Sequence, residues 1–199
     1  MRKQVFWLGK DGKWRYEISD NIDISDPGNK VRFNSSILLK NFNSNGKQEP
    51  VKLPELYENK ELYEAVPELK NISVRLNPDL PEKANGQYLP HEKIIEIADP
   101  ADRKTVLHEI QHAINRIVGS KFKGTSIKTQ KEKGWFLTEE EAYQMYRDQP
   151  GEMEARLVER RVGITHKKLR KTPPWETLER LLREEGIHLP NSKVSNKLY

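Results

Sequence analysis

Residues 93–119 read KIIEIADPADRKTVLHEIQHAINRIVG. The apolar run at their start, Lys93–Ala98, contains three isoleucines and predicts a β-strand. Apolar residues then recur at helical spacing, Asp99 can cap a helix, and Pro100 suits its first position. Gly119 is a typical residue for the end of a helix. The stretch therefore predicts a strand followed by a half-buried helix.

Two of the chain's five histidines, His108 and His112, lie four positions apart on this helix, with Glu109 directly after the first. Residues four apart project from one side of a helix, so both imidazoles can bind one ion at the roughly 2.0–2.1 Å of zinc–nitrogen bonds. Glu109 is rotated by about 100° and can reach a water molecule on that ion. Zinc lowers the pKa of such a water to about 7, and a nearby carboxylate can take its proton as the water attacks a carbonyl group. The pattern predicts a Zn²⁺ site with two ligands and a general base.

The composition restricts the remaining ligand. The chain of 199 residues has no cysteine, so a metal can bind only to His, Asp or Glu. A catalytic zinc ion usually has three protein ligands and one open position. The stretch PGEMEAR contains two candidates, Glu152 and Glu154, on a predicted helix. Residues two apart on a helix point about 200° away from each other, so only one of them can be the third ligand.

Signals for strands and helices alternate along the rest of the chain and predict an α+β fold. QVFWLG and WRYEIS flank an Asp-Gly turn and predict a hairpin. Residues 53–69 carry apolar positions at helical spacing, and KNISVRLN after them predicts a strand. From residue 138 we expect one helix, a break at 149–151, and a second helix that begins at Glu152. Thr172 and Pro173 can start a last helix.

These signals suggest three parts. Residues 1–50 form a β-hairpin and a loop-rich N-terminal segment, residues 51–166 the core with the histidines, and residues 167–199 a C-terminal helix and tail packed on that core.

The order of the candidate ligands resembles that of the gluzincin-type zinc metallopeptidases. In that family the third ligand opens a Glu-x-x-(Ser/Ala)-(Asp/Asn) stretch on a second helix, some forty residues after the HExxH pair. Alignment of Ala155 with the small residue of this stretch implies that Glu152 is the ligand rather than Glu154. Arg156 stands where an acidic or amide residue usually holds the far nitrogen of a histidine, so the resemblance leaves that partner unassigned.

A second resemblance covers most of the chain. DGKWRYEISD, LYEAVPEL, TVLHEIQHAI and YQMYRDQPGEMEAR, in this order, are similar to zincin-like modules in large polyvalent proteins of phages and other mobile elements. The resemblance implies a zincin-like fold, in which a small twisted sheet packs on the HEIQH helix and a second helix crosses it. It also implies a metallopeptidase that acts on a peptide or protein, with an extended substrate added to an edge strand beside the helix. KIIEIA is the candidate for that strand.

Peptide hydrolysis also needs a donor for the oxyanion that forms on the carbonyl. Tyr143 or Tyr146, on the helix before Glu152, can provide a hydroxyl group for this purpose. Packing of both tyrosines between helices is an equally good interpretation.

The surface composition suggests a rival function. The net charge is +5, and residues 120–134 and 167–171 are rich in lysine. A catalytically inactive zincin-like module could use them to bind nucleic acid or another phage or host protein. Glu109 argues against this alternative, because a purely structural zinc ion needs no base between its ligands.

No apolar run approaches the roughly 18 residues of a membrane span, and the first residues lack the apolar stretch of a signal peptide. We therefore expect a protein without a membrane partner, which is cytoplasmic or delivered into a host cell. We also expect a monomer.

Overall fold

The computed structural model describes residues 6–8, 14–16, 31–41, 48–81, 84–119, 138–164, 168 and 171–184, and for the first two ranges the backbone alone. Contacts within the chain group it into two compact units, residues 30–159 and residues 1–29 together with 160–199. The boundaries expected at residues 50 and 166 stay a prediction.

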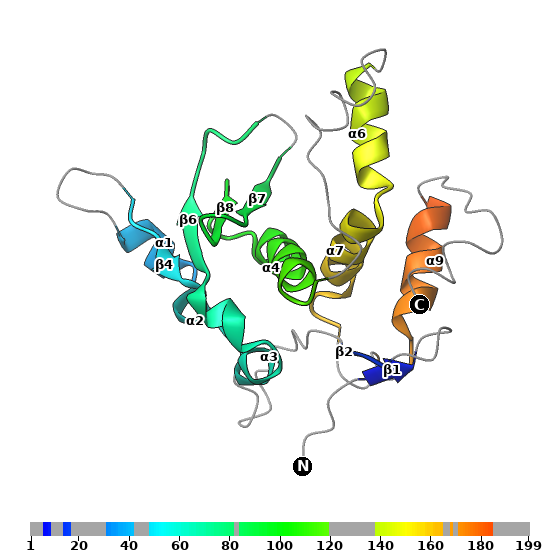
Figure 1. Ribbon diagram of the computed structural model, residues 1–199, viewed down its shortest axis with the longest axis horizontal. Helices are drawn as coiled ribbons and strands as arrows, with labels where there is room; N and C mark the ends of the chain where they lie inside the picture. Colours follow the sequence, from blue (N-terminus) through cyan, green and yellow to red (C-terminus); the bar gives the residue numbers. More distant parts are fainter. Residues whose placement is uncertain are drawn as a thin grey trace. The chain divides into compact units, whose positions relative to one another are not determined.

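The larger unit mixes short strands and helices, which confirms the α+β class (Figure 1). Its described elements are, in chain order, β3 (Arg32–Phe33), α1 (Ser36–Lys40), β4 (Val51–Lys52), α2 (Leu53–Leu56), β5 (Tyr57–Glu58), α3 (Lys60–Ala65), the 3-10 helix η1 (Pro67–Asn71), β6 (Ser73–Leu76), β7 (Gly86–Leu89), β8 (Ile94–Ile97), α4 (Arg103–Ile117), α6 (Glu139–Arg147) and all but the last two residues of α7 (Pro150–Arg161).

Four of the strands form one sheet in the order β4-β6-β8-β7. β6 and β8 are parallel, whereas β4 and β7 run antiparallel to their neighbours. The strand predicted at Lys93–Ala98 is present as β8, but its expected position at an edge is wrong. β8 lies between β6 and β7, and Ile95, Glu96 and Ile97 are all buried, as in a strand covered on both faces.

Among the described strands, β7 is the edge of the sheet beside β8. The sequence did not predict β7, because Gly86 begins it and Pro90 follows it, and both residues are uncommon inside strands. The edge strand therefore comes from the segment that precedes KIIEIA.

Helix α4 packs on β7 and β8, as Figure 1 shows. Gly86 faces this helix so closely that an added Cβ atom would lie 2.5 Å from Thr105 Cγ2 and 3.2 Å from Glu109 Cγ. A distance under 3.0 Å between such atoms forces a shift, and the hydrogen bond from Thr105 Oγ1 to Asp102 Oδ2 holds the rotamer that places this methyl group. The absence of a side chain at Gly86 thus sets how near β7 lies to the helix with the histidines.

Gly86→Ala is therefore expected to lower the free energy of unfolding by about 1–3 kcal/mol, the usual cost of overpacking. Thr105→Ser removes Cγ2 and keeps the hydroxyl group that donates to Asp102. The free energies of unfolding of the two single variants and the double variant form a double-mutant cycle, measured by urea denaturation. The double variant should lose less stability than the sum of the two single losses. Additive effects would contradict the close contact.

The opposite face of the sheet carries a polar row. Arg75, Glu96 and Gln87 are paired across β6, β8 and β7. The buried carboxylate of Glu96 accepts hydrogen bonds from Arg75 Nε at 2.7 Å, from Asn77 Nδ2 at 3.0 Å and from Gln87 Nε2 at 2.5 Å. Burial raises the pKa of Glu96, but these donors and the charge of Arg75 outweigh it, so the net shift is downward. The row therefore stabilises the ionised form of Glu96.

A lowered pKa in the folded state means that Glu96 stabilises the fold above the ordinary glutamate pKa of about 4.3, and that this contribution disappears as the pH falls through the folded pKa. Glu96→Gln should reduce the free energy of unfolding at pH 7. The difference from the original chain should shrink when urea titrations are repeated at steps below pH 4.5. A difference that stays constant with pH would show that the charge of Glu96 is not what matters.

Two predicted helices differ in detail from the structure. Asp102, not Asp99, caps α4, because its side chain accepts from the Thr105 backbone N–H, whereas Asp99 accepts from Ala101 in the preceding turn. The helix expected over residues 53–69 is wrong as a single element. β5 separates α2 from α3, and Asn59 caps α3 by accepting from Leu62 N–H.

The remaining predicted elements fit more closely. β6 confirms the strand in KNISVRLN, and Gly119, with φ at +66°, follows α4 as expected. α6 and α7 are separated at Asp148–Gln149, and α7 begins at Pro150, two residues earlier than predicted.

In the smaller unit, β1 (Phe6–Leu8) and β2 (Trp14–Tyr16) pair antiparallel, which confirms the hairpin, and the Asp-Gly turn lies outside the described residues. α9 (Pro174–Glu184) confirms the last predicted helix, but its first position is Pro174 rather than Pro173, so Thr172 does not cap it. Arg161 Nη1 donates to Thr177 Oγ1 at 2.8 Å. None of the helices in the described ranges has the length and apolar character to cross a membrane.

Candidate metal centre

Helix α4 presents His108 and His112 on consecutive turns. Their Nε2 atoms lie 3.0 Å apart, and the ring planes meet at 66°. Val106, Ile110 and Ala113 on the same helix are fully buried, so the apolar stripe fixes α4 in the core and leaves the histidine flank towards α7. His108 is 8 % exposed, and both rings are thus largely removed from solvent.

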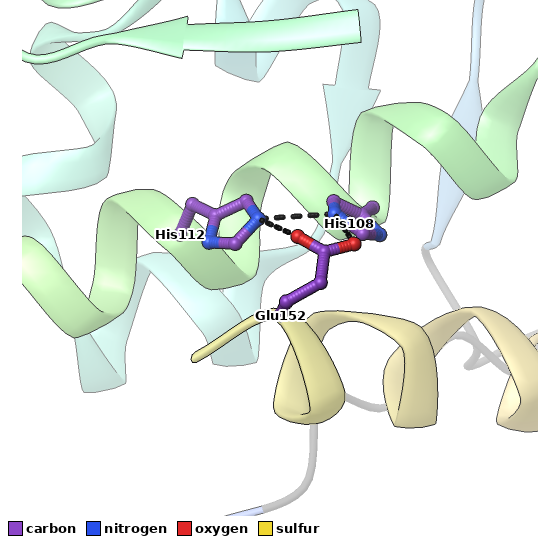
Figure 2. A group of neighbouring side chains, drawn as sticks. All are labelled: His108, His112 and Glu152. Atoms are coloured by element: carbon purple, nitrogen blue, oxygen red, sulfur yellow. Dashed lines mark hydrogen bonds and ion pairs between the residues drawn. The ribbon is translucent and has the colours of Figure 1, made fainter. Parts of the chain in front are cut away.

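Helix α7 supplies a carboxylate to the two rings. Figure 2 shows Glu152 reaching across from the first turn of α7 to the space between His108 and His112. Its Oε1 atom is 3.3 Å from His108 Nε2, and its Oε2 atom is 3.3 Å from His112 Nε2. One ligand atom from each of the three residues can be chosen so that all lie within 4.8 Å of one another. Two imidazoles and one carboxylate therefore converge.

The spacing of these atoms fits a tetrahedral ion. With bonds of about 2.0–2.1 Å, two ligands of a tetrahedral zinc ion lie about 3.3–3.4 Å apart. His108 Nε2 and His112 Nε2 are 3.0 Å apart, and each lies 3.3 Å from a different oxygen of the Glu152 carboxylate, so each of these pairs is close to this value. Glu152 Oε2 is also buried and makes no aligned hydrogen bond, although it faces His112 Nε2. The donor set fits zinc, which at catalytic sites keeps one coordination position for a small molecule.

The charges at the site favour a cation between the rings. Burial lowers the pKa of His108, but Glu152 and Glu159 outweigh this effect and raise the pKa to about 10. Burial raises the pKa of Glu152, and the two histidines shift it further in the opposite direction, to well below its ordinary range. A proton and a metal ion thus compete for His108, and metal binding at this site would release a proton.

Glu109 follows His108 in the chain and is buried, and the charges of His108, His112 and Glu152 act on its carboxyl group. Burial raises the pKa of Glu109, whereas His108 and His112 lower it, and the net shift is upward. Its side chain lies next to Gly86 of β7, so the sheet edge and this carboxyl group adjoin each other. A carboxylate with a raised pKa is a stronger base, as a general base requires.

The two candidate tyrosines differ in position. Burial, followed by the charge of Glu152, raises the pKa of Tyr146, so the charge of this candidate ligand acts on the Tyr146 hydroxyl group. Tyr143 stacks on Tyr146 with ring centroids 6.4 Å apart, and Arg147 lies 5.7 Å from the Tyr143 ring centroid. Of the two tyrosines, Tyr146 is therefore the one whose pKa is raised by the charge of Glu152, and Tyr143 stacks on it.

Glu154, the other candidate for the third ligand, is not part of the cluster. Its Oε2 atom accepts a hydrogen bond of 2.9 Å from Asn115 Nδ2 of α4. Glu152 and Glu154 point in different directions, as expected for residues two apart on a helix. Of the two candidates, Glu152 is the one that the structure places beside the histidines.

One residue at the site was missed from the sequence. Glu159, seven positions after Glu152, has its Oε1 atom 2.9 Å from His108 Nδ1. The two atoms are at ion-pair distance but are not aligned as a hydrogen bond. The sequence contains a signal for Glu159, because residues seven apart lie on the same face of a helix. Glu159 is thus a second acidic residue on the face of α7 that carries Glu152.

Comparisons of the chain with protein-family models, with curated proteins and with solved structures found no match. The evidence for a metal centre therefore consists of the positions and chemistry of these side chains.

The choice between the two glutamates can be tested by metal content. The purified chain should retain about one zinc ion after dialysis, because a buried site with three ligands binds tightly. Glu152→Ala should lose most of this zinc, whereas Glu154→Ala on the same helix should retain it. Plasma mass spectrometry measures the ratio of zinc to protein. The reverse pattern would exclude the assignment of Glu152.

Proposed function

We propose that this chain is a zinc-dependent peptidase with a zincin-like fold. The observation that carries the proposal is the convergence of His108, His112 and Glu152, with the buried carboxyl group of Glu109 beside them. In this assignment the first three residues hold the ion and Glu109 remains free to transfer protons. A bound zinc ion would polarise a substrate carbonyl group and lower the pKa of a water molecule.

The protein side chains then have distinct roles in hydrolysis. Glu109 takes a proton from the attacking water and delivers it to the leaving amine, which its raised pKa favours. Tyr146, whose raised pKa keeps its hydroxyl group protonated, donates a hydrogen bond to the oxygen of the carbonyl group under attack. Tyr143 supports Tyr146 by stacking on it, and Arg147 in turn lies over the Tyr143 ring.

The free side of β7 is the place for the substrate in this proposal. β7 is an edge of the sheet among the described strands, packs on α4, and contains Gly86 next to Glu109. A peptide that pairs with this edge would form backbone hydrogen bonds and pass beside the general base. In this arrangement β7 takes the substrate-binding role that the sequence suggested for β8. It predicts that the protein binds extended peptides with little dependence on the side chains of the peptide.

The donor set also accepts ferrous iron, as in oxygenases with two histidines and one carboxylate. The presence of Glu109 favours hydrolysis over oxygenase chemistry, because a carboxyl group that is not one of the proposed metal ligands can transfer protons. The origin in a phage or another mobile element rests on the resemblance alone.

The rival function is an inactive zincin-like module that binds nucleic acid or another protein through basic residues. Its candidate segments are residues 120–134 and 167–171, of which the structure describes only Lys168 and Lys171. Nothing in the described residues specifically favours it.

The decisive variant is Glu109→Gln, which keeps the shape of the side chain and removes the base. It should retain zinc and lose activity by about 10²–10⁴-fold, the usual contribution of a general base. Activity is measured on a fluorogenic library of extended peptides, with Glu154→Gln as the matched control for a nearby carboxylate. Cleavage by Glu109→Gln at the original rate would exclude this base. Zinc binding without cleavage of any peptide by the original chain would favour the inactive module.

A further inference from the structure

The ring of His108 has a carboxylate at each nitrogen. Its Nε2 atom faces Glu152 and the His112 ring, whereas its Nδ1 atom lies 2.9 Å from Oε1 of Glu159. The ring is buried, so solvent cannot satisfy the far nitrogen, and Nδ1 makes no aligned hydrogen bond in the part of the chain that the structure describes. The carboxylate of Glu159 is the acceptor that lies at this nitrogen.

Helix geometry explains why Glu159 can take this position. Seven residues make nearly two turns, so Glu152 and Glu159 project from the same face of α7 towards α4. Arg156, one turn after Glu152 on the same helix, is also buried. A guanidinium group has only donors, so Arg156 cannot accept a proton from an imidazole N–H. The carboxylate one turn further along the helix is the acceptor within reach.

A histidine that binds a metal ion through Nε2 carries its proton on Nδ1. An acceptor at Nδ1 fixes this tautomer and the direction of the ring, and a carboxylate also makes the ring a stronger ligand. We propose that Glu159 is a positioning residue that accepts the Nδ1 proton of His108 and holds its Nε2 atom at the metal centre. This inference rests on the proposed metal site. It assigns the hydrogen-bond acceptor of His108 to the residue seven positions after Glu152, because the residue four positions after Glu152 is Arg156.

The alternative for Glu159 is purely structural. Its charge also acts on Arg156, three residues earlier, so it could serve only to balance that buried cation. The two roles differ in their effect on the metal. Loss of a structural ion pair lowers stability, whereas loss of the acceptor weakens zinc binding and frees the Nδ1 proton.

The test is the zinc affinity of the full chain, measured by competition with a chelator of known affinity between pH 6 and 8. Glu159→Ala should bind zinc about 10–100-fold more weakly, as is typical when such a partner is removed. Glu159→Gln keeps an acceptor oxygen and the size of the side chain, so its loss should be smaller. Glu154→Ala is the matched control, because it removes the same charge from the same helix without a contact to His108, and its affinity should not change.

A spectroscopic readout separates positioning from stability. In ¹⁵N–¹H spectra of the zinc-loaded chain, the Nδ1–H of His108 should give a signal protected from exchange with water. The signal should persist in Glu159→Gln and exchange rapidly in Glu159→Ala. Should Glu159→Ala fail to fold, the zinc affinity of Glu159→Gln decides, and an affinity identical to that of the original chain at every pH would overturn the inference.

The outcomes distinguish this inference from the proposed function. If the original chain binds no zinc, the metal site is wrong and the role of Glu159 with it. If the chain binds zinc through Glu152 but Glu159→Ala shows lower stability with unchanged affinity, the metal site stands and only the positioning role is overturned.

Discussion

Helix α7 packs against α4 so that the carboxylate of Glu152 faces two imidazoles in a region with little solvent. Burial alone disfavours a charged carboxylate and a charged imidazole, and each persists only when an opposite charge compensates it. Here the two Nε2 atoms lie 3.0 Å apart, a distance at which both rings cannot carry a proton towards each other without repulsion. A cation shared by all three groups removes this conflict, and the proposed function depends on that property.

The sheet is part of the same arrangement. Because Gly86 lacks a side chain, β7 approaches α4 closely enough to lie beside Glu109. The buried residues of β8 and the apolar stripe of α4 hold the helix against the sheet, so the histidines are carried by regular elements rather than by loops. On the other face, the hydrogen bonds to Glu96 connect β6, β8 and β7. Both faces of the small sheet thus contribute to the position of the edge strand.

Local signals in the sequence were sufficient for part of this structure. The spacing of His108 and His112 and the apolar stripe of α4 require only helical geometry, and the strand at residues 94–97 follows from its isoleucines. The choice of Glu152 over Glu154 came from a resemblance, because helical geometry excludes their joint use but not either one alone. The place of β8 inside the sheet depends on pairing with β6 and β7, which lie at other positions in the sequence.

Other features depend on tertiary contacts that local patterns do not encode. The helical spacing of residues 53–69 was overridden by the pairing of β5 with β3 and by the cap at Asn59. Glu159 was overlooked because the expected position for its role, four residues after the ligand, holds Arg156. The importance of Gly86 became visible only once a threonine of α4 was found against it.

The central claim is that two histidines of one helix and Glu152 of another bind a single ion. Diffraction data from crystals of the zinc-loaded chain, collected above and below the zinc absorption edge, test it most directly. The account predicts one anomalous peak within about 2.0–2.2 Å of His108 Nε2, His112 Nε2 and a carboxylate oxygen of Glu152. A peak at other residues, or none between these three side chains, would contradict it.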